Sequence, residues 1–347
     1  MGKIAVLIVD DSFFMRRVIG DILRADPDIE IVGEAADGVE ALEKIAHLHP
    51  NVVTLDIEMP EMNGVETLRH IVARDERPAV VMVSGFAPEG AEITLECLRL
   101  GAVDFVAKPS GSFSLDMSKV AEELRRKVEA AAAANLQAKD AAKESASKSP
   151  VPHEPHYHKE SGVVIIGSST GGPAALESIL PMLPANFPYA VAVAQHLPSE
   201  FTDSFLGRLK KTCQLPVERA EDDVPLKPGT LYIVAGGTTT TITERDNRRV
   251  FAVVTNTVDI QTPSVDELMA SAAAVYGNKT IGVILTGMGS DGLLGMGRIK
   301  QTGGATIVQD EASSVVYGMG KEVVEGGLAD HIVPLSQVIN KVNELLQ

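Results

Sequence analysis

The sequence of 347 residues has no tryptophan and only two cysteines, Cys97 and Cys213. Two cysteines so far apart make neither a disulfide framework nor a cysteine-built zinc site, and they fit a reducing compartment. Basic residues number 31 against 47 acidic ones, which gives a formal net charge of −16. Affinity for nucleic acids and anionic membranes comes mainly from clustered lysine and arginine, so neither partner is expected.

Long apolar runs are also missing. No run approaches the ~20 residues that a membrane-spanning helix needs, and the N-terminal MGKIAVLIVDD places acids directly after a short apolar run, unlike a signal peptide. Hydrophobic residues nevertheless make up 45% of the chain, enough for real cores. We therefore expect a cytoplasmic protein without membrane insertion, divided into two domains of roughly 150 residues each.

The first section alternates short Val/Ile-rich runs with amphipathic stretches. The candidate strands are Ile4–Val9, Ile29–Ala35, Val52–Asp56, Ala79–Ser84 and Asp104–Ala107. Strands that are apolar throughout, separated by helix-like segments of roughly 10–15 residues, predict a parallel sheet covered on both faces. We expect one domain of βα units over residues 1–128.

Residues 129–160 are predicted to be a linker, helical at its start and then extended, because apolar periodicity is lost and prolines follow. The linker holds three histidines that either bind a metal or, as is commoner, form a solvated surface: His153, His156 and His158.

A second α/β pattern fills residues 161–347, where we expect a doubly wound, mostly parallel sheet. Its candidate strands are Val163–Ile166, Tyr189–Ala194, Thr230–Val234, Val250–Val254, Thr280–Leu285, Ala305–Val308 and His331–Pro334.

Acidic and polar side chains follow the strands of the first section. Asp10 and Asp11 come after the first strand, Asp56 and Ser84 end the third and fourth, and Lys108 follows the fifth. The carboxyl ends of parallel strands converge on one edge of a sheet. Three carboxylates brought together there repel one another unless a cation joins them, and oxygen ligands with room for water suit Mg²⁺. With the lysine to neutralise an anion, such a pocket suits a metal-bound phosphoryl group.

The first section resembles the receiver domain of two-component response regulators. The resemblance rests on VDDS, on LDIEMPEMNG, on the hydroxyl at Ser84 and on the Lys108–Pro109 pair. It implies a flavodoxin-like (βα)5 fold with Asp56 as the phosphoacceptor. The residues it assigns to Mg²⁺ are Asp10, Asp11, Asp56 and, through its carbonyl, Glu58. The residues it assigns to the phosphorylation switch are Ser84, Phe105 and Lys108.

In the second section, GSSTGGP follows a strand and precedes a helix-like segment, with Ser169 at the centre of a G-x-S-x-G pattern. Glycines permit a sharp turn there, and the free N–H groups of a helix start attract negative charge. The anion is either a nucleotide phosphate or the oxyanion of an acyl-transfer intermediate.

If Ser169 is a nucleophile, it needs a base. The domain contains two histidines, His196 and His331. His196 follows an apolar run, at the same sheet edge as Ser169, whereas His331 begins a run and so lies at the opposite edge. Asp291 follows another strand and is the candidate for orienting the base. The order Ser…His…Asp along the chain differs from that of the α/β-hydrolases, which disfavours that fold.

This section also resembles the catalytic domain of the chemotaxis protein-glutamate methylesterases, the CheB family. The carrying stretches are IGSSTGGP, QHLPSEFTDSFLGRL, PSVDELMASAA, ILTGMGSDGLLGM and QDEASSVVYGM. The resemblance implies a triad of Ser169, His196 and Asp291, with the Met288 backbone N–H as an oxyanion donor and Thr170 as a neighbouring contact.

The same resemblance implies a function in chemotaxis adaptation. The expected enzyme is a phosphorylation-activated hydrolase that removes methyl esters from glutamyl side chains of chemoreceptors, releases methanol and deamidates specific receptor glutamines. Its expected partners are these receptors and a chemotaxis histidine kinase as phosphodonor, and ester hydrolysis is expected to need no cofactor.

Two other hypotheses remain open at this stage. In one, GSSTGG, GGTTTT and TGMGSDG cradle the phosphates of a nucleotide, although the lysine of a P-loop is missing. In the other, the second domain is a catalytically dead scaffold that only binds chemoreceptors.

Overall fold

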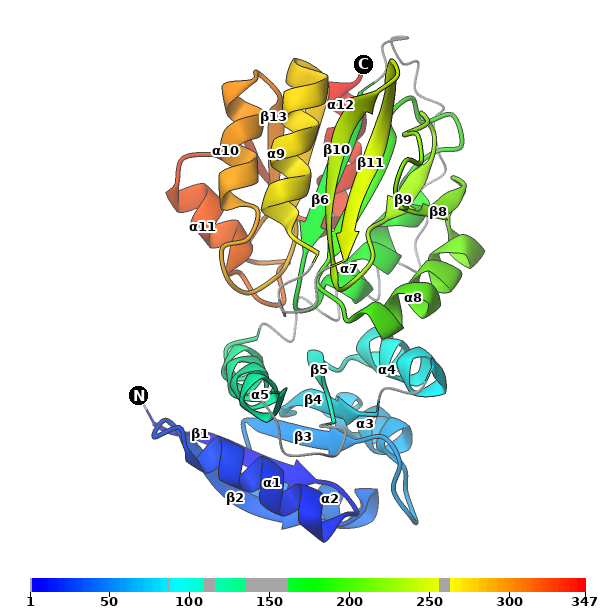
Figure 1. Ribbon diagram of the computed structural model, residues 1–347. Coiled ribbons are helices and arrows are strands. Elements are labelled where there is room, and N and C mark those ends of the chain that lie inside the picture. The colour runs from blue at the N-terminus through cyan, green and yellow to red at the C-terminus, as the bar shows by residue number, and fades with distance from the viewer. Residues whose placement is uncertain (1, 86–87, 109–115, 135–161, 256–262) are drawn as a thin grey trace. The chain divides into compact units, whose positions relative to one another are not determined.

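The computed structural model describes residues 2–85, 88–108, 116–134, 162–255 and 263–347. The chain divides into two compact units, Met1–Leu136 and Gln137–Gln347, and each contains a parallel sheet with helices on both faces (Figure 1). The limits of the two domains and of the linker remain predictions. The three linker histidines lie outside the described residues: His153, His156 and His158.

The N-terminal unit is built on a five-stranded parallel sheet in the order β2-β1-β3-β4-β5. All five strands have the predicted bounds: β1 Ile4–Val9, β2 Ile29–Ala35, β3 Val52–Asp56, β4 Ala79–Ser84 and β5 Asp104–Ala107. The helices are α1 Phe13–Arg24, α2 Gly38–Leu48, α3 Gly64–Val72, α4 Pro88–Leu100 and α5 Asp116–Ala132. The (βα)5 fold expected from the sequence is confirmed.

Local sequence explains where these helices start. Ser12, Asp37 and Asn63 precede α1, α2 and α3, and each accepts a hydrogen bond from the backbone N–H three residues further on. These are preferred N-cap residues, because their side-chain oxygens satisfy a donor that the helix leaves unpaired. Helix α1 packs beside α5, while α2, α3 and α4 are neighbours in that order. The helices that follow β1, β2 and β3 therefore each begin with a side-chain cap, close to the strand ends where Asp10 and Asp56 lie.

The C-terminal unit is built on a seven-stranded parallel sheet in the order β14-β13-β12-β6-β7-β9-β8. Its strands are β6 Val163–Ser168, β7 Ala190–Gln195, β8 Val217–Arg219, β9 Leu231–Ile233, β12 Thr280–Ile284, β13 Ala305–Gln309 and β14 His331–Val333. The helices are α7 Gly172–Ile179, α8 Ser199–Thr212, α9 Val265–Tyr276, α10 Leu293–Gln301, α11 Met319–Glu325 and α12 Val338–Leu345, with single 3-10 turns at Leu180–Met182, Gly277–Lys279 and Leu335–Gln337.

One predicted strand belongs elsewhere. The run Val250–Val254 was expected in the parallel sheet, but it lies in β11 (Arg248–Thr255), which pairs antiparallel with β10 (Thr238–Arg245) in a separate two-stranded sheet. Asp246 and Asn247 join the two strands, both with positive φ, as a tight hairpin turn requires. Strand β8, a three-residue element, was not predicted at all.

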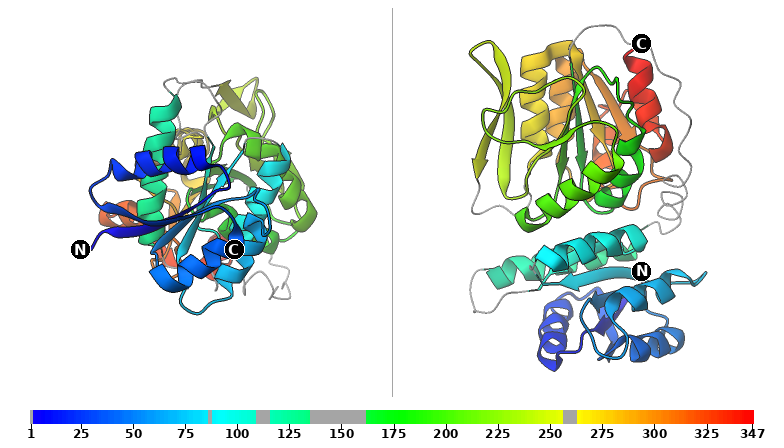
Figure 2. Two further views of the ribbon diagram at one scale, coloured as in Figure 1. Left: turned by 90° about the horizontal axis from the view of Figure 1, so that it is seen from below. Right: turned by 90° about the vertical axis from the view of Figure 1, so that its right-hand side faces the viewer.

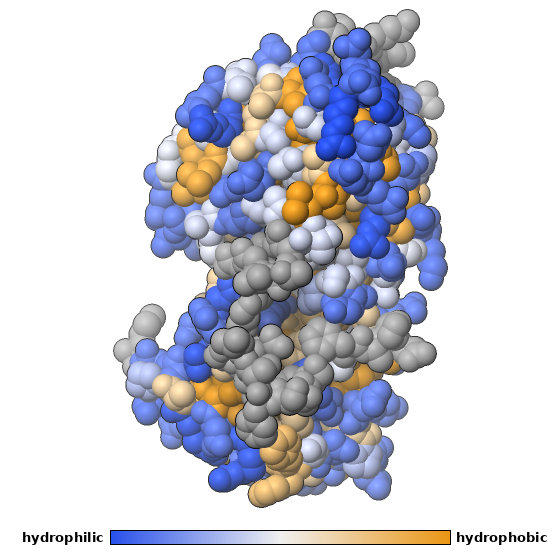
Figure 3. Space-filling model, in the orientation of Figure 1, coloured by the Kyte–Doolittle hydropathy of each residue, from blue (hydrophilic) through white to orange (hydrophobic). Residues whose placement is uncertain are grey.

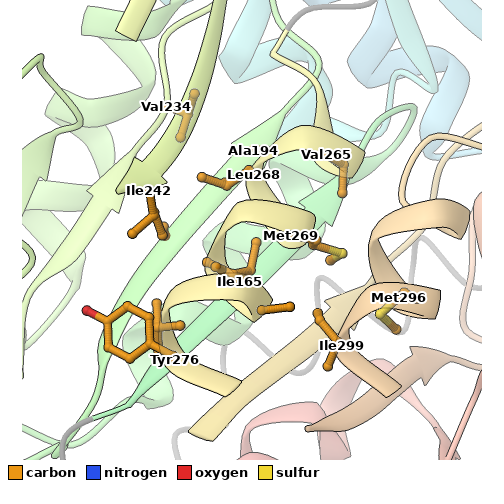
Figure 4. Packing of buried hydrophobic residues seen from close by; sticks show 14 of the residues in the cluster. Ile165, Ala194, Val234, Ile242, Val265, Leu268, Met269, Tyr276, Met296 and Ile299 are labelled. Atoms are coloured by element: carbon orange, nitrogen blue, oxygen red, sulfur yellow. The ribbon is translucent and has the colours of Figure 1, made fainter. Parts of the chain in front are cut away.

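The main hydrophobic core of this unit lies between the sheet and the layer formed by α9, α10 and the β10–β11 hairpin. Helices α9 and α10 and the β10–β11 hairpin cover one face, and α7 and α12 cover the other (Figure 2). Ile165 and Ala194 of the sheet meet Leu268 and Met269 of α9 in a fully buried cluster (Figure 4). Burial of such side chains stabilises each by about 1.5–3 kcal/mol, so the helix start at Val265 is held firmly against the strands.

Polar residues cover much of the outer face of each unit, with apolar residues in small groups among them (Figure 3). The described part of the chain contains no helix that is long and apolar enough to cross a membrane.

Candidate active site

Three loops meet at the carboxyl edge of the seven-stranded sheet. Ser169 follows β6 and His196 follows β7 directly, and Asp291 lies in the loop between β12 and α10. In the sheet order, β6 lies between β12 and β7. The connections run to opposite sides of β6, so the edge between β6 and β12 is a topological switch point, the usual ligand crevice of an open α/β sheet.

Ser169 lies on a sharp turn between β6 and α7. Gly171 has a φ of +77°, and a Cβ there would come within 2.8 Å of the Val315 side chain. The backbone N–H of Ser169 donates to the Thr286 carbonyl (3.1 Å), and its carbonyl accepts from Gly172 N–H (2.8 Å). The turn therefore presents the half-buried Ser169 hydroxyl at the rim, as the G-x-S-x-G pattern predicted.

His196 and Asp291 form a direct pair, with Nε2 of the ring 2.8 Å from Oδ2 of the carboxylate. The carboxylate also accepts the backbone N–H groups of Val265 (2.8 Å, Oδ2) and Asp266 (2.9 Å, Oδ1) at the start of α9. Burial would raise the pKa of Asp291, but the hydrogen bond from His196 and the N–H of Val265 outweigh it and hold that pKa below its ordinary value. Asp291 is therefore a firmly ionised partner for the imidazole.

The pairing of Nε2 with Asp291 leaves Nδ1 as the ring nitrogen that can take the proton of Ser169. Among the described residues, neither Nδ1 nor the Ser169 hydroxyl forms a hydrogen bond. Within the described part of the chain, neither group therefore has a competing hydrogen-bond partner.

Gln195, the last residue of β7, joins the Ser169 turn to His196. It is 2% exposed, and its Nε2 donates to the carbonyls of both Ser169 (2.9 Å) and His196 (3.0 Å). Its Oε1 accepts from Ser168 Oγ (2.6 Å), the residue paired with it across the strands. The side chain therefore fixes the separation of the two residues. The sequence analysis missed it, although its place directly before His196 on a buried strand was a usable signal.

The Met288 backbone N–H is a group that could stabilise negative charge beside Ser169. No hydrogen bond among the described residues uses the Met288 backbone N–H, whereas the Ser169 N–H is already bonded to Thr286. Thr170 is buried, and its carbonyl accepts from Thr286 Oγ1 (3.0 Å). Thr286, another residue that the sequence analysis missed, thus holds the turn on which Ser169 and Thr170 lie.

Other sequence expectations fare differently. His331 is the first residue of β14, at the amino edge of the sheet, as predicted. The segment GGTTTT, a candidate phosphate loop, instead runs into β10, where Thr238 Oγ1 donates to the Ala235 carbonyl (2.7 Å) and Thr240 is buried. It does not offer the exposed N–H cradle that the nucleotide hypothesis needs.

The N-terminal unit brings together the predicted carboxylates. One oxygen from each of Asp10, Asp11 and Asp56 lies within 4.8 Å of the others. Asp10 and Asp56 are buried, while Asp11 is exposed and lines a cavity of about 850 Å³ together with Glu58. Clustered carboxylates open to water on one side fit a Mg²⁺ ion, which keeps several waters.

Lys108 supplies the positive charge of this cluster. Its Nζ lies 2.7 Å from Asp56 Oδ2 and 3.0 Å from Asp10 Oδ2. Burial raises the pKa of Asp56 to about 6, because desolvation outweighs the stabilising contact with Lys108. Although burial alone would lower it, the pKa of Lys108 is raised by its contacts with Asp56 and Asp10. The ammonium therefore stays charged where an anion would bind.

The remaining switch residues lie on β4 and β5. Ser84 ends β4, but its side chain lies outside the described part of the chain. Phe105 is buried in β5, with Lys127 Nζ 4.8 Å from the centre of its ring. That ammonium also donates to the Phe105 carbonyl (2.6 Å) and pairs with Asp104 (3.2 Å). The sequence analysis did not single out Lys127, because the contact depends on how α5 packs.

Residues 164–342 match the family model of the CheB methylesterase, and residues 6–117 match that of the response regulator receiver domain. A protein of Thermotoga maritima named protein-glutamate methylesterase/protein-glutamine glutaminase is 43% identical over 346 residues, which cover 99% of this chain and 98% of that protein. A protein of Pyrococcus abyssi with the same name is 39% identical over 342 residues, which cover 97% and 92%.

A solved structure is also similar to the C-terminal unit. The crystal structure of the Thermotoga maritima CheB methylesterase catalytic domain has a TM-score of 0.52 and 41% sequence identity, and the match covers 54% of this chain and 99% of that one.

Proposed function

Because this chain belongs to the CheB methylesterase family, we propose that Ser169, His196 and Asp291 are the residues with which it hydrolyses esters. It is a CheB-type methylesterase with a receiver domain, a carboxylic ester hydrolase whose relatives are named both methylesterase and glutaminase. Its phosphorylation-activated role in chemotaxis adaptation follows from that family.

The proposed reaction starts with attack of Ser169 Oγ on the γ-carbonyl of a glutamyl methyl ester. His196 Nδ1 takes the hydroxyl proton and passes it to the departing methoxide, so that methanol leaves and an acyl-enzyme remains. Water then attacks the acyl carbon, gives its proton to His196, and the proton returns to Ser169 as the glutamate is released. Asp291 keeps the imidazole oriented and stabilises its positive charge in both steps.

The tetrahedral intermediates of this reaction carry an oxyanion. We assign its stabilisation to the Met288 backbone N–H, which no hydrogen bond among the described residues uses, with Thr170 as the neighbouring contact. Loss of one such donor typically costs about 3–4 kcal/mol of transition-state stabilisation. The sharp turn at Ser169 and the loop after β12 face the same edge, and this arrangement supports the assignment.

Glutamine deamidation is a proposed second activity of the same site. A glutamine side chain presents the same carbonyl, with ammonia in place of methanol as the leaving group. Relatives from Thermotoga maritima and Nitratidesulfovibrio vulgaris carry glutaminase in their names, so release of ammonia from unmethylated receptor is the assay for it.

In the receiver domain we propose Asp56 as the phosphoacceptor. Asp10, Asp11, Asp56 and the Glu58 carbonyl would hold Mg²⁺, which neutralises phosphoryl oxygens when it is bound. Lys108 would receive the phosphoryl oxygens, and Ser84 and Phe105 would respond to phosphorylation as switch residues.

The proposed partners are methyl-accepting chemoreceptors as substrates and a chemotaxis histidine kinase as phosphodonor, in the cytoplasm. We do not include nucleic acid among the proposed partners, because acidic residues outnumber basic ones by 47 to 31.

The direct pair of His196 and Asp291 beside the Ser169 turn is the observation that carries the proposed function. Its test is methanol release from methylated receptor membranes, measured for the intact chain and for Ser169→Ala, with and without a small-molecule phosphodonor and Mg²⁺. Release by the intact chain alone, increased by the phosphodonor, is expected. Equal release by both proteins would overturn the assignment, and the absence of release from either would favour a scaffold that only binds receptors.

A further inference from the structure

Two aspartates exchange hydrogen bonds between the starts of α9 and α10. Asp291, two residues before the start of α10, accepts the N–H groups of Val265 and Asp266 at the start of α9. In return, Asp266 Oδ1 accepts the N–H groups of Gly292 (2.9 Å) and Gly295 (2.7 Å) at the start of α10. Each carboxylate therefore satisfies donors that the other helix leaves unpaired.

The exchange needs an unusually close approach of the two helices, which lie side by side on the sheet (Figure 1). Gly292 has a φ of +102°, and a Cβ on it would lie 2.4 Å from the Ile284 side chain. A Cβ on Gly295 would lie 2.5 Å from Met269 Cβ and 3.2 Å from Asp266 Cα. Val265 and Met269 of α9 and Met296 of α10 belong to the buried core cluster (Figure 4). Glycines at both positions let the backbone reach Asp266.

The arrangement is costly, because two acids lie near each other in a half-buried place. Desolvation and the charge of Asp291 raise the pKa of Asp266. The hydrogen bonds from Gly295 and Gly292 lower it, but they do not cancel the increase. An apolar or neutral residue would avoid this cost if Asp266 only filled space. Local costs of this kind are typically retained at functional sites.

We propose that Asp266 is a positioning residue of the esterase reaction: it holds the start of α10 so that Asp291, the residue before Gly292, presents its carboxylate to His196. This inference rests on the proposed function of Ser169, His196 and Asp291. Asp266 reaches the substrate only through these groups, so its loss should lower kcat and leave KM nearly unchanged. A displacement of about 1 Å in a catalytic group can cost about 100-fold in rate.

The test compares three variants of the full chain, with methanol release from methylated receptor membranes as the assay. Asp266→Asn keeps an oxygen that can accept both N–H groups, whereas Asp266→Glu keeps the charge but moves it by one methylene. Asp266→Ala removes the acceptor. We expect Asp266→Asn to keep at least about a third of kcat, and Asp266→Glu and Asp266→Ala to lose about 10- to 100-fold, each with KM within about twofold.

A matched control is Asp330→Ala. Asp330 Oδ2 also accepts a backbone N–H, that of Thr306 (3.0 Å), but at the start of β13, on the opposite edge of the sheet. The Asp330→Ala substitution should lower the melting temperature without changing kcat per folded molecule. If Asp266→Ala does not fold, the order of Asp266→Asn and Asp266→Glu decides. A kcat for Asp266→Glu equal to or above that of Asp266→Asn, or losses that only follow the folded fraction, would overturn the inference.

Covalent labelling of Ser169 by a fluorophosphonate probe separates this inference from the proposed function. The labelling rate depends on the Ser169–His196–Asp291 relay and not on a receptor. If labelling slows in Asp266→Glu but neither the intact chain nor any variant releases methanol, the positioning role stands and the proposed substrate is wrong. Methanol release by the intact chain with unchanged labelling in all Asp266 variants overturns the positioning role alone. If the intact chain shows neither labelling nor methanol release, both proposals are overturned.

Discussion

Binding of Mg²⁺ to the receiver domain should depend strongly on pH near 6. Burial raises the pKa of Asp56 to about 6, while an aspartate in an unfolded chain has a pKa of about 3.9. The native protein therefore holds this proton more tightly than the unfolded chain does. Stability from that proton is fully present below pH 3.9 and is lost as the pH rises through 6.

The magnitude follows from the same values. Each pKa unit corresponds to about 1.4 kcal/mol, so an ionised Asp56 lowers the stability of the metal-free native state by about 3 kcal/mol at neutral pH. Mg²⁺ needs the ionised carboxylate and must displace the proton at lower pH. The ionised fraction falls about tenfold between pH 7 and pH 5, and the affinity for Mg²⁺ should fall by the same factor.

The assay is calorimetric titration of the full chain with Mg²⁺ at pH 5, 6 and 7, accompanied by thermal melting with and without the ion. The dissociation constant should rise about tenfold from pH 7 to pH 5, and the Mg²⁺-induced gain in melting temperature should shrink. In Asp56→Asn, which has no proton to displace, binding should be weaker and this pH dependence should vanish. A dissociation constant that is equal at pH 5 and pH 7, or the same pH dependence in Asp56→Asn, would refute the reasoning.

Three further predictions concern the esterase rim. Gln195→Met removes the side-chain N–H group that bonds the Ser169 and His196 carbonyls, so the free energy of unfolding should fall by about 1–3 kcal/mol and kcat by at least about tenfold. The control variant Gln214→Met, at an exposed position, should match the parent in melting temperature and methanol release. Asp291→Asn should slow fluorophosphonate labelling of Ser169 by about 10²–10⁴-fold, and parental labelling would argue against its role. Thr286→Val removes the hydroxyl that holds the Thr170 carbonyl, so kcat should fall about tenfold in a folded protein, and an unchanged kcat would show that the turn holds itself.

The sequence was sufficient to predict which residues meet at each sheet edge. Asp10 and Asp56 follow or end parallel strands, as do Ser169 and His196, and the ends of parallel strands converge whatever the side chains between them. The position along a strand therefore determines the neighbourhood of these residues. Strand bounds in the N-terminal unit could be predicted for the same reason, since each is a short apolar run between amphipathic helices.

What the sequence could not reveal depends on side-chain direction and on the pairing of distant strands. The bonds from Gln195 to the Ser169 carbonyl and from Thr286 to the Thr170 carbonyl join segments far apart in the sequence, and although the position of Gln195 directly before His196 singles it out, no spacing in the chain encodes its partner. The hairpin was missed because an apolar run such as Val250–Val254 fits either sheet, and the turn at Asp246 decides which. Contacts of this kind follow from tertiary packing.

In both units, carboxylates lie close together at the switch point of a parallel sheet, but the two units stabilise their negative charge differently. Each gathers carboxylates at the switch point of a parallel sheet, where like charges repel. In the receiver, Asp10 and Asp56 have one ammonium between them, and the raised pKa of Asp56 indicates that this ammonium only partly offsets the cost of burying the carboxylate charge. At the esterase rim, the N–H groups at the start of α9 and the His196 ring hold the pKa of Asp291 low without a metal. The same sheet geometry therefore holds one carboxylate with a raised pKa and one with a lowered pKa, which is the difference that the proposed roles of Asp56 and Asp291 require.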